Sequence, residues 1–426
     1  MASFQNTVCK IRLNSITDIP VENYAGLYYY NSIKDGLPYG YFDINDQSGK
    51  YMASFENLQI GAEVEINIVD IDSEVEYPLG KNLVILNSEA VFDKKADQFM
   101  GIIRVWFGHA WFLYKDVKNH AYQPMNSAKL IEKILKSKDR GIAFNVEKGA
   151  ILETDDEGKI ARYKVCETDW DFIQNKILPY CAINQLPVHF FNDTITFNLK
   201  SFKDLYTQNP MCVFMPAEGN LTSQEQINKI QNFIKTNNIK ISFPIQESFL
   251  KIGNIEMFDE LFPSFYFENL EKGTFFTGQK RLGNKIISRS GSNFGNILPL
   301  DQKFMFQSSG SSVKIIHNRQ AIDSFSLLFE TGKNLDFAFN LVLQTGFNGM
   351  IIGKTASVFA PDTLGRDGKE KEHWLNGKWM INTIEHFNNP ENYNQMYSRT
   401  HLVRSNFIGN DNKTSLGLSA MMYGAP

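Results

Sequence analysis

The stretch NGKWMINTIEHFNNPENYNQMYSRTHLVRSN, residues 376–406, predicts a two-stranded β-ribbon. Residues 378–387 alternate in the way that places successive side chains of a strand on opposite faces. One face carries Trp379, Ile381 and Thr383, and the other carries Met380, Asn382, Ile384 and His386. Residues 388–392 are turn formers that stop this strand before Tyr393 begins the next one. The ribbon favours a β fold, and by itself it indicates no chemistry.

The length and charge of the chain limit the classes of protein to which it can belong. Its 426 residues exceed the usual size of one domain, and they predict roughly two to four packed units. The chain has 43 Lys and Arg residues against 47 Asp and Glu residues, a formal net charge of −4. No long-range field of one sign is available to attract nucleic acid or an anionic membrane surface, so we expect the partners to be proteins.

The cysteines and the N-terminus indicate a reducing compartment. Cys9, Cys166, Cys181 and Cys212 are scattered and include no C-x-x-C pair, so we expect buried core thiols. The N-terminus holds no apolar run of signal-peptide length, and nowhere do about 18 uninterrupted apolar residues occur. We therefore expect a soluble product made in the cytoplasm. Aromatic residues make up 13% of the chain, a share that favours large cores and subunit interfaces.

Residues 1–110 predict a first β domain. Within it, residues 63–68 alternate strictly, as in a strand with one buried and one wet face. The apolar set is Val64, Ile66 and Ile68, and the polar set is Glu63, Glu65 and Asn67. Residues 40–49 predict a strand that runs into a turn, and residues 83–86 and 101–107 predict further strands.

Residues 111–205 predict an α+β insert domain. The apolar stripe of a short amphipathic helix lies over Ser127–Lys136. Thr168 and Asp171 match a capping box that opens a second helix. A hairpin is expected in residues 188–197, with Asn192 and Asp193 at its turn.

Residues 206–312 predict a helix followed by a loop-rich contact region. Thr222 and Glu225 form the capping box of this helix, which is expected to end at Asn237 and Asn238. From residue 273 to residue 312 the chain is rich in Gly, Ser and Asn, a composition typical of long loops or a contact arm.

The last block uses the same pattern as the first. Residues 313–410 predict a second β domain, and residues 411–426 a C-terminal tail. Ile352-Gly353 stands before strand-forming residues much as Ile60-Gly61 does, which is consistent with an internal duplication and equally with two unrelated strand starts. The fold class expected is α+β and mainly β, with two similar antiparallel β domains and α+β insert domains between them.

The candidate catalytic and metal-binding residues fit structural roles better than chemical ones. His373, His386 and His401 lie in one region, but their spacing fits neither a helix nor a zinc knuckle, so structural roles are preferred. The carboxylates of Asp155, Asp156 and Glu157 fit a solvated hairpin turn better than a calcium or general-acid site. The glycine-rich residues 291–295 lack the lysine of a phosphate-binding loop, and no G-x-S-x-G elbow occurs. The sequence predicts no catalytic residue, no metal site and no cofactor.

Residues 378–381 and 384–386, followed by residues 397–406, resemble the closing ribbon of the baseplate hub proteins of contractile-tailed bacteriophages. The same superfamily includes the phage late control protein D and the base domain of VgrG spike proteins. Residues 40–68 resemble the strand, turn and strand of the first tube domain, and residues 122–136 its following helix. A short run at residues 288–291 resembles the later half of the hub. No single motif is specific, and the resemblance lies in the order of the matches over about 400 residues.

The resemblance implies a structural protein and not an enzyme. It implies two tube-like β domains per chain and a homotrimeric, pseudo-six-fold ring that joins the tail tube to the central spike. The expected partners are two further copies of the chain, the tail tube or distal tube protein and the spike, with baseplate wedge and tape-measure proteins as further candidates. The expected location is the tail baseplate of a virion assembled in the host cytoplasm, with DNA only as passing cargo.

Three alternatives stay open at this point. Glu63, Glu65 and Asn67 suit the wall of a water-filled channel and equally a solvated outer face. The same fold could be the hub or spike base of a related contractile injection system. A tail-associated cell-wall-degrading or carbohydrate-binding protein is the third reading.

Overall fold

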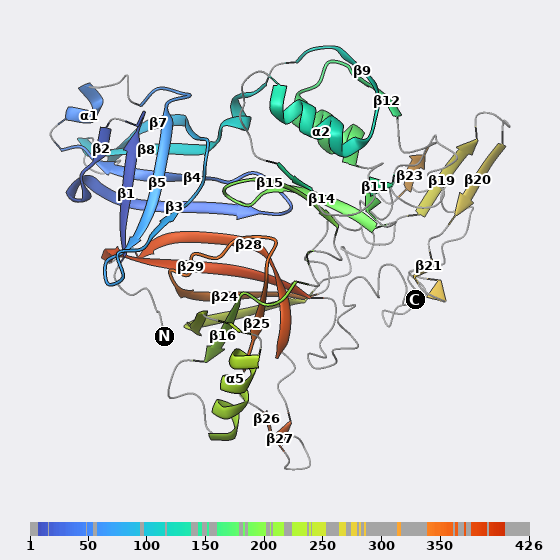
Figure 1. Cartoon of the computed structure of the whole chain (residues 1–426). Helices are drawn as coiled ribbons and strands as arrows, with labels where there is room; N and C mark the ends of the chain where they lie inside the picture. Colours follow the sequence, from blue (N-terminus) through green and yellow to red (C-terminus); the bar gives the residue numbers. More distant parts are fainter. Residues whose placement is uncertain are drawn as a thin grey trace.

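The computed structural model describes residues 7–252 and 339–404 with short gaps. Between these ranges it describes only residues 264–269, 274–278, 281–282, 285–286 and 313–316. Most of the described elements are strands, as Figure 1 shows, so the mainly β class is confirmed. None of the described helices is long and apolar enough to cross a membrane.

A sheet of 15 strands contains segments from both ends of the chain. Its main path, in order, is β17 (Ile241–Ile245), β16 (Cys212–Pro216), β25 (Thr355–Val358), β28 (Gly377–Asn389), β3 (Tyr24–Ser32), β4 (Tyr39–Asn45), β8 (Gln98–His109), β7 (Leu83–Asp93), β5 (Glu63–Asp70), β1 (Thr7–Leu13) and β2 (Thr17–Ile19). Four strands branch from this path, namely β6 (Glu76–Pro78), β18 (Glu247–Ile252), β24 (Phe339–Gly346) and β29 (Asn392–Arg404). In Figure 1 the blue strands of the first block lie directly beside the red strands of the last.

A smaller α+β part stands beside this sheet. It has the strand order β10 (Phe144–Val146), β15 (Phe197–Ser201), β14 (Leu186–Asn192), β13 (Ala182–Ile183) and β11 (Ile151–Leu152), with a separate pair of β9 (His120–Met125) and β12 (Ile160–Lys164). Its helices are α2 (Ser127–Lys136) and α3 (Asp169–Phe172), the latter continued by a π-helical turn at Ile173–Ile177. Leu130, Phe172 and Phe197 belong to its separate apolar core.

The remaining described elements are short or stand apart. The helices are α1 (Lys50–Ala53), α5 (Gln224–Thr236) and the 3-10 turns Val21–Asn23 and Ala110–Leu113. The strands are β19 (Ser264–Asn269), β20 (Thr274–Gly278), β21 (Arg281–Leu282), β22 (Lys285–Ile286), β23 (Val313–Ile316), β26 (Thr363–Leu364) and β27 (Glu370–Lys371). α5 flanks the large sheet near β16, with Ile230 packed in a small cluster around Val213 and Met215.

Local patterns in the sequence account for several elements. In β5 the predicted apolar residues Val64, Ile66 and Ile68 are buried. The helix predicted at Ser127–Lys136 is present with those bounds, and Asn126 caps it by accepting a hydrogen bond from the Ala128 amide at 2.9 Å. The predicted hairpin of residues 188–197 is formed by β14 and β15. The N-cap of the predicted capping box is confirmed at α3, where the Asp171 amide donates to the Thr168 hydroxyl at 3.1 Å and this hydroxyl donates to the Asp171 carboxylate.

The large sheet contains two groups of five strands, and the strands within each group are hydrogen-bonded to one another in the same order. The first group is β3-β4-β8-β7-β5 and the second is β18-β24-β29-β28-β25, and every pairing in both groups is antiparallel. In both groups the long central hairpin carries a β-bulge, between Ile85 and Asn87 in β7 and between Ile381 and Thr383 in β28. The two groups therefore share topology and a local irregularity.

The same two backbone hydrogen bonds are formed at each bulge. The Gly61 amide donates to the Ile85 carbonyl at 2.8 Å, and the Ile85 amide donates to the Ala62 carbonyl at 2.8 Å. In the second group the Gly353 amide donates to the Ile381 carbonyl at 2.9 Å, and the Ile381 amide donates to the Lys354 carbonyl at 2.8 Å. Both glycines have positive φ, +90° and +73°, a conformation that residues with a side chain seldom adopt.

The two groups are joined because β28 pairs with β3. The pairing is antiparallel and runs from Thr383 opposite Ser32 to Phe387 opposite Tyr28. One apolar core underlies both groups and includes Ile66, Phe107 and Trp379. The proposed division into domains of residues 1–110, 111–205, 206–312, 313–410 and 411–426 stays a prediction.

Two expectations need correction. The ribbon of β28 and β29 is present, but its predicted faces are wrong beyond the bulge. Because Ile381 stands opposite Leu402 and Thr383 opposite the adjacent His401, Ile381 and Thr383 lie on opposite faces. The face shared by Trp379 and Ile381 continues instead with Ile384 and His386, all of which are buried.

The second correction concerns the cysteines. Cys9 and Cys212 are buried as expected, but Cys166 is exposed, because it lies in the turn before α3 with its amide bonded to the Asn119 side chain. Several predicted features lie outside the described residues: Cys181, Thr222, His373, the acidic turn at Asp155, Asp156 and Glu157, the glycine-rich residues 288–295 and the tail from residue 411.

Candidate functional site

The junction between β3 and β28 brings the first and last blocks of the chain into contact. Its side chains are tied across the strand pair: the Asn388 side chain accepts hydrogen bonds from the Leu27 amide at 2.8 Å and from the Tyr24 hydroxyl. At the other end the Thr383 hydroxyl bonds to the Ser32 hydroxyl at 3.1 Å. These buried polar groups are satisfied only when the two strands are paired in this register, so they specify the junction.

A charged cluster lies on the solvent-facing side of this junction. His401 Nε2 is 2.8 Å from Glu385 Oε1, and Arg399 Nη1 is 3.5 Å from Glu385 Oε2. Tyr28 donates to the same carboxylate at 3.5 Å. Burial alone would raise the pKa of Glu385, but the hydrogen bond and charge of His401 and the charge of Arg399 outweigh it and hold this pKa below its ordinary value. Glu385 is therefore a satisfied, ionised carboxylate and a poor proton donor near neutral pH.

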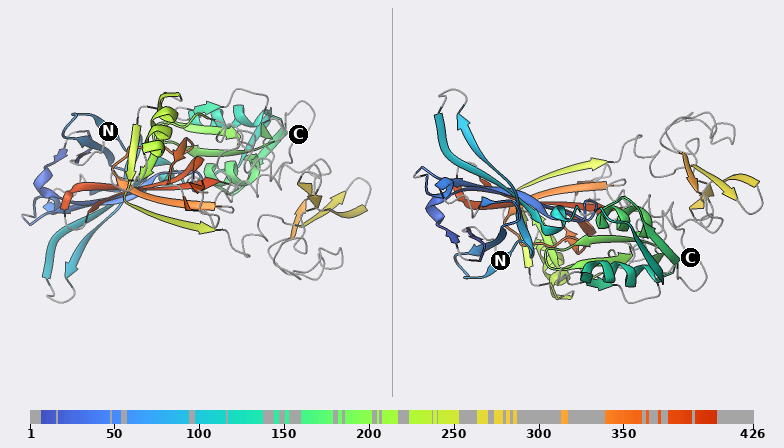
Figure 2. Two further views of the ribbon diagram at one scale, coloured as in Figure 1. Left: turned by 90° about the horizontal axis from the view of Figure 1, so that it is seen from below. Right: turned by 90° about the horizontal axis from the view of Figure 1, so that it is seen from above.

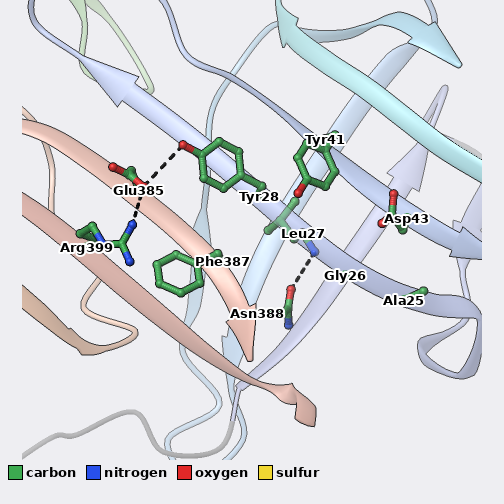
Figure 3. A pocket seen from close by; sticks show the side chains of 10 residues that line it. All are labelled: Ala25, Gly26, Leu27, Tyr28, Tyr41, Asp43, Glu385, Phe387, Asn388 and Arg399. Atoms are coloured by element: carbon green, nitrogen blue, oxygen red, sulfur yellow. Dashed lines mark hydrogen bonds and ion pairs between the residues drawn. The ribbon is translucent and has the colours of Figure 1, made fainter. Parts of the chain in front are cut away.

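An open hollow of about 430 Å³ lies beside this cluster. It is lined by Ala25, Gly26, Leu27, Tyr28, Tyr41, Asp43, Glu385, Phe387, Asn388 and Arg399. Figure 3 shows Glu385 joined to the Tyr28 hydroxyl and to Arg399, with Phe387 close to Arg399 and Asn388 bonded to the Leu27 amide. The lining holds no serine, cysteine or histidine nucleophile, and its carboxylates are engaged by arginines. The charged and aromatic lining of the hollow is suited to polar and stacking contacts.

An arginine occupies the same position in both groups of strands. Arg104 in β8 makes two bonds of 2.9 Å to Asp43 in β4 and stands opposite Glu89 in β7. Arg399 in β29 lies between Gln344 in β24 and Glu385 in β28. Sequence reasoning missed both arginines, because their partners lie on different strands and no local motif joins them.

Aromatic side chains cover the same face of β3, β4 and β8. Tyr28 stacks on Tyr41 with ring centroids 5.7 Å apart, and Tyr41 contacts Trp106 at 5.0 Å. Tyr30 and Tyr39 form a further pair at 5.0 Å. The repeated tyrosines of residues 28–30 and 39–41 are the signal from which this row could have been found. Such half-buried rings are typical of surfaces that make further contacts.

The predicted histidine cluster does not form a site. His386 is buried, with its Nδ1 2.8 Å from the Ser398 hydroxyl and its ring stacked on Tyr29, and burial lowers its pKa to about 3. His401 lies on the opposite face of the ribbon, next to Glu385. Among the described residues, no group of three or more His, Cys, Asp and Glu side chains could hold a metal ion.

A second hollow, of about 400 Å³, lies over β1 and β5 and carries paired charges. Lys10 binds Glu76 at 2.7 Å and Arg12 binds Asp18 at 2.7 Å. Glu65, one of the polar residues expected on the wet face of β5, lies 3.9 Å from Arg12. The opposite charges cancel locally, so this surface has little field of either sign.

Comparisons with known proteins give a fold and no sequence family. No protein-family model matches the chain, and no curated protein matches it in sequence. Among solved structures, a tail protein from Neisseria meningitidis MC58 is 10% identical with a TM-score of 0.53, and the match covers 98% of each chain. The 43 kDa tail protein of prophage MuSo2 from Shewanella oneidensis is 8% identical with a TM-score of 0.52, over 93% of this chain and 98% of that one. The resemblance in the sequence is thereby confirmed at the level of the fold: over nearly its whole length, the chain has the fold of these two tail proteins.

Proposed function

We propose that this chain is a structural protein of a contractile phage tail, the hub of the baseplate. It works as a homotrimer that joins the tail tube to the central spike and leaves a channel for DNA. Its partners are two further copies of itself, the tail tube or distal tube protein and the spike. Its place is the virion tail, and it performs no catalytic step.

The observation that carries the proposal is the repeated group of five strands within one continuous sheet. A chain with two similar modules presents six modules when three copies surround an axis. Such a ring matches a six-fold tube on one side and a three-fold spike on the other. The shared fold with two tail proteins, at nearly complete coverage of both chains, supports the same assignment.

The electrostatics of the described surface are consistent with a passive channel. Lys10, Arg12 and Arg104 are each engaged by a carboxylate, so they are not arranged as a row of free cations along the sheet. A polyanion gains affinity when protein cations displace the counterions condensed on its phosphates, and cations already paired with carboxylates contribute little to this. DNA is therefore expected to pass such a surface without strong binding.

The proposal is tested by a reconstruction of the tail tip calculated without imposed symmetry. Three copies of this chain are expected on the tail axis, between the last tube ring and the spike. Six copies, or copies displaced from the axis, would contradict the trimeric hub. A second arm tests for enzymatic activity: purified chain incubated with bacterial cell walls should release no soluble fragments.

A further inference from the structure

Within the two repeated groups of strands, two described edges have no strand partner over part or all of their length. β7 pairs with β8 along its whole length but with β5 only at Leu83 and Val84, so its outer edge is open beyond the bulge. β18 pairs with β24 on one side only. In both views of Figure 2 the β7–β8 hairpin, light blue and teal, projects to one side, and β18 and β24, lime and orange, extend in a different direction away from it. Open edges of this kind attract further strands.

The two edges are the counterparts of the two edges that pair inside the chain. In the order of the repeated groups, β7 corresponds to β28 and β18 corresponds to β3. Inside the chain, β28 leaves β25 after Met380, passes the bulge, and pairs with β3 from Thr383 onward. β7 likewise leaves β5 after Val84 and passes its own bulge. Beyond that point β28 pairs with β3, whereas none of the described strands pairs with the outer edge of β7.

We infer that the open edge of β7 pairs with the open edge of β18 from a second copy of this chain, antiparallel, in the manner of the internal β28–β3 junction. The inference deepens the proposed function by naming the surfaces through which copies meet, and it rests on that function only for the number of copies in the ring. Each copy offers one edge of each kind, so the contact is heterologous and repeats around an axis until the ring closes.

The repeat also fixes the register. The matching hydrogen bonds of Gly61 and Gly353 make Ile85 in β7 equivalent to Ile381 in β28. Glu89 and Glu385 follow these residues at the same spacing, so they are equivalent as well. In the neighbouring strands, Gly40 pairs with Phe107 as Leu341 pairs with Leu402, so these two pairs are equivalent. Following the register from them to β3 and β18 makes Tyr30 equivalent to Lys251. Since Glu385 stands opposite Tyr30 inside the chain, Glu89 stands opposite Lys251 of the second copy.

The chemistry at this register fits the contact between copies. Residues directly opposite each other in an antiparallel pair share a face, and opposite charges there are favourable. Glu89 is exposed, and its carboxylate accepts a long hydrogen bond of 3.5 Å from the Trp106 ring nitrogen. Arg104 of the same copy stands opposite Glu89 as Arg399 stands opposite Glu385, and a lysine on the facing strand of the second copy adds a further cation at this position.

Cross-linking with paired cysteines tests the contact. In a Cys166→Ser background, the double variant Glu89→Cys with Lys251→Cys is oxidised in the purified full-length chain at rising protein concentration. Covalent dimers and trimers that need both cysteines are expected. A mixture of the two single variants should stop at dimers, because a heterologous contact uses one residue from each copy. Cross-linking of either single variant alone indicates an isologous contact and overturns the inference.

The internal junction supplies the matched control. Glu385→Cys with Tyr30→Cys places cysteines at the corresponding positions within one chain, and it should form an intramolecular disulfide under the same oxidation. If this control closes while the double variant stays monomeric at every concentration, the inference is wrong. The charge pair is checked separately: Glu89→Lys should lower the yield of assembly, and adding Lys251→Glu should restore it.

The outcomes separate this inference from the proposed function. Closed covalent trimers support both. Closed rings of another size keep the strand pairing and contradict the trimeric hub. Three copies on the tail axis with β7 and β18 of neighbouring copies apart would keep the hub and contradict the pairing.

Discussion

At the scale of single residues, one glycine in each repeated group fixes the backbone next to the bulge. Gly61 and Gly353 have positive φ and bond to the strand residue before a bulge. Their surroundings differ: a Cβ on Gly61 would meet only Leu113 at 3.7 Å, whereas one on Gly353 would lie 2.5 Å from the buried ring of Phe191. The Ile-Gly pair was visible in the sequence, but its hydrogen bonds were not, because they join residues about two dozen positions apart.

Replacing each glycine by alanine separates backbone strain from steric overlap. Gly61→Ala should lower the free energy of unfolding by roughly 1 kcal/mol, the cost of a side chain at positive φ. Gly353→Ala should cost about 1–3 kcal/mol more, because Phe191 is packed and cannot yield freely. Urea unfolding of both variants measures the difference, and equal losses would contradict the close approach to Phe191.

Buried histidines make the fold sensitive to acid. Burial lowers the pKa of His386 to about 3 and those of His109 and His189 to about 4. These imidazoles stay neutral in the folded chain and take up protons on unfolding, near pH 6.5. Their stabilisation is complete above about pH 6.5 and is lost as the pH falls toward 4, by up to ~2 kcal/mol for each ring at pH 5.

The acid sensitivity is measured from urea unfolding at pH 7, 6 and 5. The free energy of unfolding should fall steadily over this range. His386→Leu should be less stable at pH 7, since it loses the hydrogen bond to Ser398. Its free energy of unfolding should fall less between pH 7 and pH 5 than that of the unsubstituted chain, by about the contribution of one imidazole. An unchanged decline in this variant would show that His386 does not titrate on unfolding.

At the scale of elements, sequence periodicity predicted those segments whose contacts are local. The alternation of β5, the stripe of α2 and the N-cap of α3 each follow from spacing within a few residues, and each is present. The bulge in β28 was not predicted. Both faces of this strand carry apolar groups, so an extra residue does not visibly disturb the alternation of polar and apolar residues in the sequence. The junction with β3 was missed because pairing between distant strands is not encoded locally.

The ribbon itself gives an element-scale prediction. Trp379 is fully buried in β28, so Trp379→Asp removes a large apolar side chain and places a charge in the core. A loss of at least ~4 kcal/mol in the free energy of unfolding is expected. Trp106→Asp in β8 is the matched control, because Trp106 lies on the half-exposed face and should cost less. Purified Trp379→Asp with unchanged thermal unfolding and normal tail assembly would show that the ribbon is not in the core.

At the scale of the whole molecule, the sheet runs without interruption from the first block to the last. The core beneath it also contains residues of both blocks, so the two groups are expected to lose structure together. The fold class was predictable from strand patterns, whereas this continuity was not, because it depends on one strand pair between residues near the two ends. The aromatic and arginine surface beside the junction depends on the same pair.

Weakening the junction should therefore affect both of its strands. Asn388→Ala leaves the Leu27 amide without its partner in a buried setting, at a cost of about 1–3 kcal/mol. Amide hydrogen exchange, followed by mass spectrometry, should become faster in both β3 and β28. Asn23→Ala, which removes a bond of 2.7 Å to the Asn45 carbonyl within the first block, is the control. Faster exchange in β28 alone would contradict the coupling.

The pairing of β3 with β28 also determines when the sheet can be completed during synthesis of the chain. Thr383 follows Ser32 by 351 residues, so on the order of tens of seconds of translation separate the two strands. Until the ribbon emerges from the ribosome, the edge of β3 is uncovered and is open to strands of neighbouring nascent chains. A chain that stops before residue 377 can never cover that edge. Completion of the last hairpin thus acts as a check on the length of the chain, and slow synthesis or truncation is the condition under which this protein is most exposed to misassembly.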